Sequence, residues 1–183
     1  MFERYSEKSR RVIFFARYEA SQLGESYIEP AHLLLGLLRE DKQLFFQLLH
    51  TKDPFPNALE ELQLQTAGEK VSTSVDLPLS MDAKRVLVYS AEESELLGHA
   101  TIETGHLLLG LLRQPGTACR ALQGKGLTLL VVREVVKGTA QKPTGPVQIV
   151  NVLRAEFKGA VMGRLKPELE PAVVYSPRLD KAQ

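Results

Sequence analysis

Apolar residues recur at three- and four-residue steps through most of the first 65 positions, which is the period of an α-helix with one buried face. The pattern predicts one helix over 6–23 and a second that begins at Pro30 and carries a wide leucine stripe. Two shorter helices are predicted over about 42–50 and 57–65. The first third of the chain is therefore predicted to consist of four helices joined by short connectors.

The same pattern returns 74 residues later. The octapeptide His-Leu-Leu-Leu-Gly-Leu-Leu-Arg occurs at 32–39 and again, unchanged, at 106–113. Sixteen of the thirty-four positions are identical when 6–39 is aligned with 80–113, which is too many for shared composition alone. We therefore interpret the chain as a tandem duplication. The second copy is predicted to contain helices over 80–97, 104–113, about 116–123 and about 128–137.

Several residues are suited to helix ends. Serine and threonine hydroxyls can accept a hydrogen bond from a first-turn amide, and a glycine can take the left-handed conformation that ends a helix. The predicted caps are Ser6, Ser80 and Thr104, and the predicted terminating glycines are Gly24 and Gly98. Gly36 lies inside a helix, where we expect it to let a neighbouring helix approach closely.

The repeats define the predicted domain organisation. Residues 1–138 form an all-α, pseudo-two-fold domain of two four-helix repeats, eight helices in all. Repeat one covers 5–65 and repeat two covers 80–138. The linker, 66–79, is rich in Ser, Thr, Gly and Asp and has no apolar period. A C-terminal extension, 139–183, shows no repeat, and its apolar segment fits either an amphipathic helix or a β segment.

Composition narrows the class of protein. The chain of 183 residues is 44% apolar and 25% charged, as in ordinary globular proteins, and its net charge of +1 supplies no general attraction for nucleic acid or anionic membranes. The extension has seven basic and four acidic side chains, a net charge of +3. There is no apolar run of bilayer length and no secretory signal, and Cys119 has no second cysteine to pair with. We expect a cytoplasmic protein in which Cys119 is a small buried residue.

Both copies carry a motif that resembles a known family. Each contains Ser-x-x-x-(Arg/Lys)-Arg-Val, then Leu-Gly, then a connector with Ile, then the leucine-rich octapeptide. This arrangement resembles the Clp N-terminal domain, the double repeat at the front of the ClpA, ClpB and ClpC unfoldase ATPases, and covers about residues 2–138. The resemblance implies an all-helical domain that receives protein substrates and docks adaptor proteins.

The motifs of catalysis are missing from the sequence. A Gly-x-x-x-x-Gly-Lys-(Ser/Thr) phosphate loop does not occur, so the ATPase modules of those unfoldases are absent from this chain. We expect a free-standing relative rather than an excised piece, because the extension is foreign to the repeat. His32 and His106 have no second ligand at metal-binding spacing, and each is predicted to be a structural histidine bonded to a neighbouring turn. We predict no catalytic residues, no metal and no cofactor.

Two functions are compatible with these features. The first is a non-enzymatic protein-interaction module of the Clp system that binds substrate proteins, adaptors or the Clp ATPase. The alternative is a Clp-like scaffold used in an unrelated regulatory role through its basic extension. Neither nucleic acid nor membrane is an expected partner, and the oligomeric state is not predicted.

The candidate binding residues come from the repeated positions and the resemblance. ClpC-type domains bind phosphoarginine at a Ser/Thr-capped helix N-terminus, with a glutamate directly before the connector histidine. Here that position holds Ala31 and Gly105, and glutamates stand two positions earlier. The serines are then either part of such a site or simple helix caps. The candidate peptide- or adaptor-binding residues, around a groove expected between the repeats, are Ser6, Arg11, Phe14, Glu29, Ser80, Arg85 and Glu103.

Overall fold

The computed structural model describes residues 3–51, 53–64 and 77–138. These residues form eight α-helices and no β-strand beyond two isolated bridges, as the repeat pattern predicted. The helices are α1 (Glu7–Leu23), α2 (Pro30–Glu40), α3 (Lys42–Leu49), α4 (Ala58–Glu61), α5 (Met81–Leu96), α6 (Thr104–Arg113), α7 (Thr117–Gly124) and α8 (Leu129–Gly138). The extension and most of the linker lie outside the described residues, so the predictions made for them are not tested.

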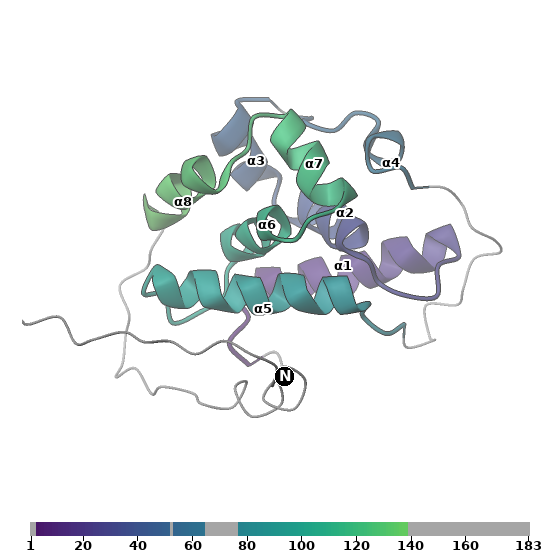
Figure 1. Ribbon diagram of the computed structural model, residues 1–183, viewed down its shortest axis with the longest axis horizontal. Coiled ribbons are helices and arrows are strands. Elements are labelled where there is room, and N and C mark those ends of the chain that lie inside the picture. The colour runs from purple at the N-terminus through teal and green to yellow at the C-terminus, as the bar shows by residue number, and fades with distance from the viewer. Residues whose placement is uncertain (1–2, 52, 65–76, 139–183) are drawn as a thin grey trace, which may run out of the picture. The chain divides into compact units, whose positions relative to one another are not determined.

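The two leucine-rich helices, α2 and α6, form the centre of the core. Each packs along its own long helix, α2 on α1 and α6 on α5, and α2 and α6 also contact each other. Figure 1 shows α1 and α5 on one side of this pair, with α3, α7 and α8 on the other. Leu33, Leu34, Leu107 and Leu108 are at most 1% exposed, so the repeated octapeptide supplies the shared core of both repeats.

Glycines allow the long and central helices to cross closely. A Cβ at Gly36 would contact the Val12 carbonyl oxygen and lie 2.9 Å from the Ala16 nitrogen of α1. A Cβ at Gly110 would meet the backbone of α5 in the same way, at Val86 and Ser90. The close approach predicted for Gly36 is therefore confirmed in both repeats.

Most predicted helix ends are confirmed. Ser6 and Ser80 are the N-caps of α1 and α5, and Gly24 ends α1 with a φ of 75°. The predicted cap at Thr104 is wrong, because Glu103 takes the N-cap position of α6. Thr104 is instead the first helical residue, and its buried hydroxyl donates a 2.6 Å hydrogen bond to Asp41 Oδ2 in repeat one. This hydrogen bond joins the two repeats, and Thr104 makes it in place of the helix cap that was predicted.

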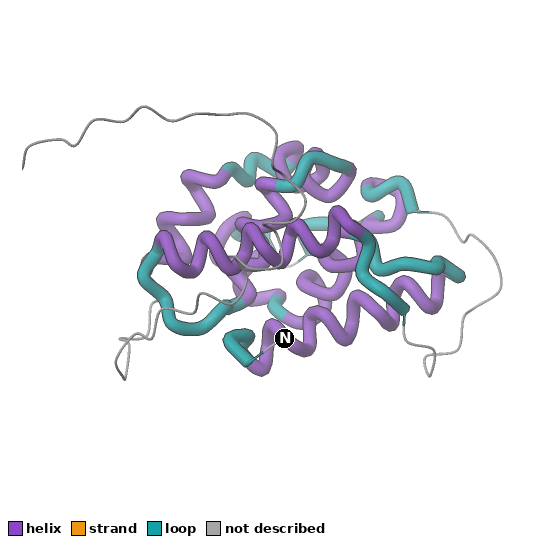
Figure 2. The backbone as a smooth tube through the Cα atoms, turned by 60° about the horizontal axis from the view of Figure 1, so that its bottom comes forward, coloured by secondary structure: helices purple, strands orange, loops and turns teal. Residues whose placement is uncertain are grey.

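The repeats exchange backbone hydrogen bonds through short segments that precede α1 and α5 (Figure 2). The segment before α1 pairs with the connector between α5 and α6, and the segment before α5 pairs with the connector between α1 and α2. The four N–H···O distances are Ser6 to Ile102 3.1 Å, Ile102 to Arg4 2.7 Å, Ser80 to Ile28 3.0 Å and Ile28 to Pro78 2.9 Å. We call these paired segments the two crossovers.

Candidate functional site

The crossovers place candidate residues of one repeat beside those of the other. Glu29 follows Ile28 on one crossover, and its Oε2 accepts a 2.8 Å hydrogen bond from the Ser80 hydroxyl of repeat two. The Ser80 oxygen also accepts from the Ala83 backbone N–H at 3.1 Å. Glu29 and Ser80 therefore form one polar site at the N-terminus of α5, built from both repeats.

The second crossover builds the equivalent site around Ser6. The Ser6 hydroxyl oxygen accepts from the Ser9 backbone N–H at 3.2 Å and lies 3.0 Å from the Ser9 hydroxyl. Glu103 follows Ile102, which pairs with the Ser6 backbone, and its side chain is exposed. This site differs from the first because a serine, Ser9, takes the contact that a glutamate makes at Ser80.

The position that carries a glutamate in the ClpC pattern faces the interior in both repeats. Ala31 is 4% exposed. A Cβ at Gly105 would point at the methyl groups of Val136 in α8. Side chains at these two positions therefore pack inside the domain, and the connector glutamates that stand at the crossovers are Glu29 and Glu103.

His32 and His106 hold the connectors to the central helices. Nδ1 of each ring accepts the backbone N–H of the preceding glutamate, at 3.0 Å from Glu29 and 2.8 Å from Glu103. Both rings are fully buried, and burial lowers the pKa of each histidine to about 4. The neutral rings serve as caps, which confirms the structural role predicted for them.

The two histidines differ at the other ring nitrogen. His106 Nε2 lies 2.8 Å from His99 Nδ1, whereas His32 Nε2 has no hydrogen-bond partner among the described residues. Glu25 occupies the position in repeat one that His99 occupies in repeat two. The nearby His99 contributes, after burial, to the low pKa of His106.

Arg11 and Arg85 are exposed on equivalent turns of α1 and α5, as a solvated helix face requires. Arg11 bonds to Glu7 and Glu40, each at 2.7 Å. Arg85 bonds only within its own helix, to Asp82 at 2.9 Å. Arg11 therefore ties α1 to the end of α2, and Arg85 makes no corresponding link to α6 through the ion pairs of the described residues.

An aromatic surface covers the outer side of α1. Phe14 is 63% exposed, and Tyr18, one turn further along, is 36% exposed. Phe15 lies edge-on to Phe14, with ring centres 5.7 Å apart. The Arg39 guanidinium of α2 stacks over Phe15 at 4.7 Å and Tyr18 at 5.0 Å. We call these four residues the α1 aromatic surface.

Phe14 is the one residue of this surface among the binding residues predicted from the sequence. Tyr18 and Arg39 were not predicted. The alignment of the repeats contains a signal for Tyr18, because its counterpart is the exposed Glu92. An aromatic residue opposite a glutamate marks an outward-facing position. Arg39 has no such signal, since Arg113 matches it in repeat two.

A buried ion cluster was also missed. Glu93 is fully buried, and its carboxylate contacts Arg133 of α8 at 2.8 Å and Arg113 of α6 at 3.2 Å. Burial alone would raise the pKa of Glu93, but hydrogen bonds and charge from Arg133 and Arg113 outweigh it and lower the pKa. The cluster fastens α5, α6 and α8 together, and its residues face the interior rather than a ligand.

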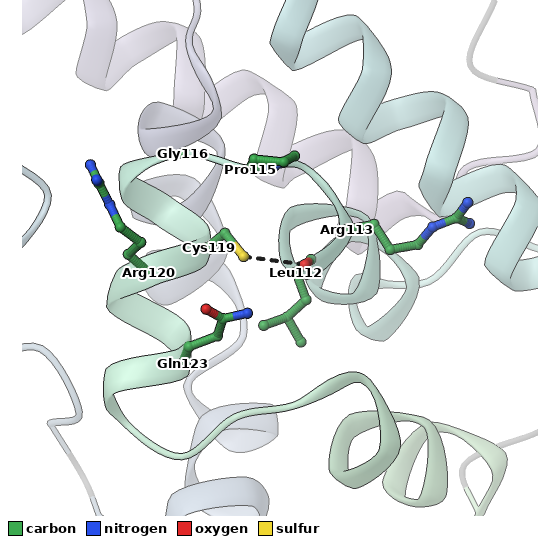
Figure 3. Close-up of a pocket in the computed structure, with 7 residues that line it drawn as sticks. All are labelled: Leu112, Arg113, Pro115, Gly116, Cys119, Arg120 and Gln123. Carbon is green, nitrogen blue, oxygen red and sulfur yellow. Dashed lines mark hydrogen bonds between the residues drawn. The ribbon is translucent and has the colours of Figure 1, made fainter.

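A pocket of about 570 Å³ lies at the end of α6, within repeat two (Figure 3). Cys119 lines it, and its thiol donates a 3.2 Å hydrogen bond to the Leu112 carbonyl oxygen. Burial raises the pKa of this thiol, so it is largely protonated near neutral pH. Cys119 is 7% exposed, which confirms the prediction of a small buried residue.

Among the residues that the structure describes, no group of three or more His, Cys, Asp or Glu side chains is placed to hold a metal ion. None of the helices described is long and apolar enough to cross a membrane.

The chain is similar in sequence to ClpA homologues, which are ATP-binding subunits of the Clp protease. A ClpA homologue of *Guillardia theta*, a Clp protease ATP-binding subunit, is 38% identical over 138 residues, which are 74% of this chain and 17% of the relative. The chloroplastic ClpA homologue CD4B of *Solanum lycopersicum* is 33% identical over 175 residues, 93% of this chain and 18% of the relative. The chain thus spans less than a fifth of the length of either protein.

A solved structure and a family model agree with this assignment. The N-terminal domain of the chaperone ClpD from *Arabidopsis thaliana* aligns with a TM-score of 0.52 and 25% identity, over 73% of this chain and 92% of that one. The model of the Clp repeat N-terminal domain matches residues 4–125 and 78–149, so that both repeats are included. The two crossed repeats, with their shared leucine core, belong to the Clp repeat N-terminal domain family.

Proposed function

We propose that this chain is a non-enzymatic protein-interaction module of the Clp unfoldase–protease system, which binds substrate proteins, adaptors or the Clp ATPase. What supports the proposal is that the seven candidate residues fall into two surface groups, one at α1 and one at α5, and that each group includes a crossover. In the α5 group, Ser80 caps the helix and bonds to Glu29 of repeat one, and Arg85 follows within the helix. In the α1 group, Ser6 caps the helix and bonds through its backbone to Ile102, the residue before Glu103, and Arg11 and Phe14 lie further along the helix. A ligand at either capping serine would contact both repeats.

The chemistry of these groups is suited to protein recognition. Each combines first-turn amides, a serine hydroxyl, a carboxylate and an arginine, which are donors and acceptors for peptide groups and charged side chains. The α1 group adds an exposed aromatic side chain, the residue type that most often anchors a protein interface. The Ser80 hydroxyl donates to the Glu29 carboxylate and also accepts from the Ala83 amide as the cap of α5, so we interpret the pair as a helix cap and propose binding without catalysis.

A pull-down from native lysate with the full chain, followed by mass spectrometry, tests the proposal. We expect a Clp ATPase subunit, a Clp peptidase or a Clp adaptor to be enriched. The variant Glu29→Gln with Glu103→Gln should reduce that enrichment, while Glu134→Gln on the exposed side of α8 should not. Absence of every Clp component from the wild-type sample would contradict the proposal.

The alternative role through the basic extension is separated by a second variant. Arg154→Gln, Lys158→Gln and Arg164→Gln together remove three positive charges from the extension. If the enriched proteins are unrelated to Clp and are lost only in this variant, the regulatory alternative replaces our proposal. We also propose a cytoplasmic location, which cell fractionation would contradict by finding the protein in an organelle.

A further inference from the structure

We infer that the α1 aromatic surface binds an acidic protein segment carrying an aromatic or large aliphatic anchor, and that each chain has one such site, on repeat one. The inference rests on the proposed function and specifies its partner. Its starting point is the duplication itself, because α5 is a copy of α1 in the same fold. Any difference between the outer faces of the two helices is a difference in surface chemistry alone.

The first difference is aromatic. Phe14, Phe15 and Tyr18 of α1 correspond to Val88, Tyr89 and Glu92 of α5. Arg113 stacks over Tyr89 at 4.4 Å, as Arg39 stacks over Phe15, so both copies retain the inner ring and its arginine. Only α1 adds the two exposed rings.

The second difference is charge. Helix α1 contains four basic and two acidic residues, a net charge of +2, whereas α5 contains two basic and four acidic residues, a net charge of −2. Lys8 and Arg10 are exposed and form no ion pair with any described residue. Arg10 precedes Phe14 by four residues on one face of the helix, and its Nε donates a 3.0 Å hydrogen bond to the Tyr5 carbonyl oxygen, which leaves its charge without an acidic partner among the described residues. A bound segment whose carboxylate lies about one helical turn from its apolar anchor would contact both Arg10 and Phe14.

The size of the surface favours a short segment over a second copy of the chain. The exposed parts of the Phe14 and Tyr18 rings together offer on the order of 200 Å². A stable interface between folded proteins needs about 800 Å² from each partner. The two rings are sufficient to anchor an extended segment of a few residues, and its acidic side chains would pair with the basic side of α1.

Nucleic acid is the less favoured occupant. Stacking aromatics and arginines also suit single-stranded nucleic acid, but such grooves are uniformly basic along the strand. Here Glu7, Glu19 and Glu40 alternate with the arginines and bind two of them, Arg11 and Arg39. The surface therefore offers too little uncompensated positive charge to follow a phosphate backbone.

Fluorescence anisotropy with the full chain and three labelled ten-residue peptides tests the inference. The first peptide alternates Asp with Phe and Leu, the second has Lys for each Asp, and the third has Ser for each Phe and Leu. We expect the first to bind at one equivalent per chain and at least about tenfold tighter than the other two, because both the anchor and the charge are needed. Equal binding of the acidic and basic peptides would overturn the inference.

Matched variants locate the site. Phe14→Ala with Tyr18→Ala should weaken binding by about tenfold or more, since exposed aromatic anchors dominate such contacts. Val88→Ala with Glu92→Ala changes the corresponding positions on α5 and should alter binding by less than about twofold. Val88→Phe with Glu92→Tyr copies the exposed rings onto α5 without the basic charge of α1, so the stoichiometry should stay at one equivalent per chain. Unchanged binding in the α1 variant would overturn the inference.

Two further outcomes would also overturn the inference. A labelled ten-nucleotide single strand that binds the wild-type chain more tightly than the acidic peptide does, but binds the variant Phe14→Ala with Tyr18→Ala weakly, would indicate a nucleic-acid site. Dimerisation in sedimentation velocity that the α1 variant abolishes would indicate a second copy. Each of these results leaves the pull-down of Clp components unaffected, so failure of this inference is distinguishable from failure of the proposed function.

Discussion

Replacing Gly36 by alanine adds one methyl group at the tightest point between α2 and α1. The new Cβ would lie 2.9 Å from the Ala16 nitrogen, whereas ordinary contact begins near 3.4 Å, and it would also meet the Val12 carbonyl oxygen. Both neighbours are backbone atoms of a helix, so no rotamer change relieves the contact. The Val12 oxygen is the nearer of the two, so the helices must separate by more than about 0.5 Å within a close-packed core.

The expected loss of stability combines two opposing effects. Overpacking a core contact costs about 1–3 kcal/mol, and moving helix backbone lies at the upper end of that range. Alanine is favoured over glycine inside a helix by about 1 kcal/mol, which offsets part of the cost. We expect Gly36→Ala to lower the free energy of unfolding by about 2 kcal/mol.

Urea unfolding followed by circular dichroism measures this change, and Gly124→Ala is the matched control. Gly124 ends α7 with no atom within 4 Å of an added Cβ and without a positive φ, so only the helix preference acts there. Its free energy of unfolding should stay unchanged or rise by up to about 1 kcal/mol. If both variants were equally stable, the reasoning from the close crossing would be refuted.

Three other predictions concern buried ionisable groups. Glu93→Gln should lower the free energy of unfolding by about 2 kcal/mol, because Arg113 and Arg133 lose a buried carboxylate partner but keep contact with water. Since the folded pKa of Glu93 is depressed, its contribution is fully present above the unfolded value, near 4.3, and urea unfolding should show it being lost as the pH falls from there through the folded pKa. The pKa values of His32 and His106 are also depressed, to about 4. On acidification the unfolded chain therefore takes up protons before the folded chain does. Each histidine should lower the free energy of unfolding by about 2 kcal/mol between pH 7 and pH 5. His32→Asn, which retains an acceptor for the Glu29 amide, should remove its share of that pH dependence; an unchanged slope would contradict this assignment. Cys119 should react with a thiol reagent far more slowly in the folded chain than in urea, because its thiol is buried and protonated; equal rates would contradict it.

The sequence predicted the helices because their apolar period is set by local geometry and appears in two copies. It predicted α4 less well, giving 57–65 where the helix covers only Ala58–Glu61. Leu62 is buried beyond the end of that helix, and Gln63 takes a positive φ of 57°. Leu62 and the partly buried Leu64 were therefore real signals of burial, whereas Leu59 is 47% exposed, and a turn rather than a further helical turn brings Leu62 to the core.

The individual residues of the candidate sites could be predicted from the sequence, but the pairs that they form in the structure could not. The repeat alignment marked Ser80 and Glu29, yet it placed each with its own repeat, whereas the crossover joins them across the duplication. A period along the chain carries no information about which segments exchange hydrogen bonds in space. Glu93 shows the same limit, since the exposed Glu92 beside it is chemically alike and only the distant Arg133 distinguishes the two.

The crossovers have a consequence for how the chain unfolds. In most tandem repeats each unit bonds mainly within itself, so one unit can open while its neighbour stays folded. Here the segment before each long helix is held by the connector of the other repeat, and opening either repeat breaks all four backbone hydrogen bonds of the crossovers. Partial opening therefore gains little entropy before it exposes unpaired amides in both halves. The duplicated domain should lose its structure in one all-or-none transition, so that two copies of one motif melt as a single cooperative unit.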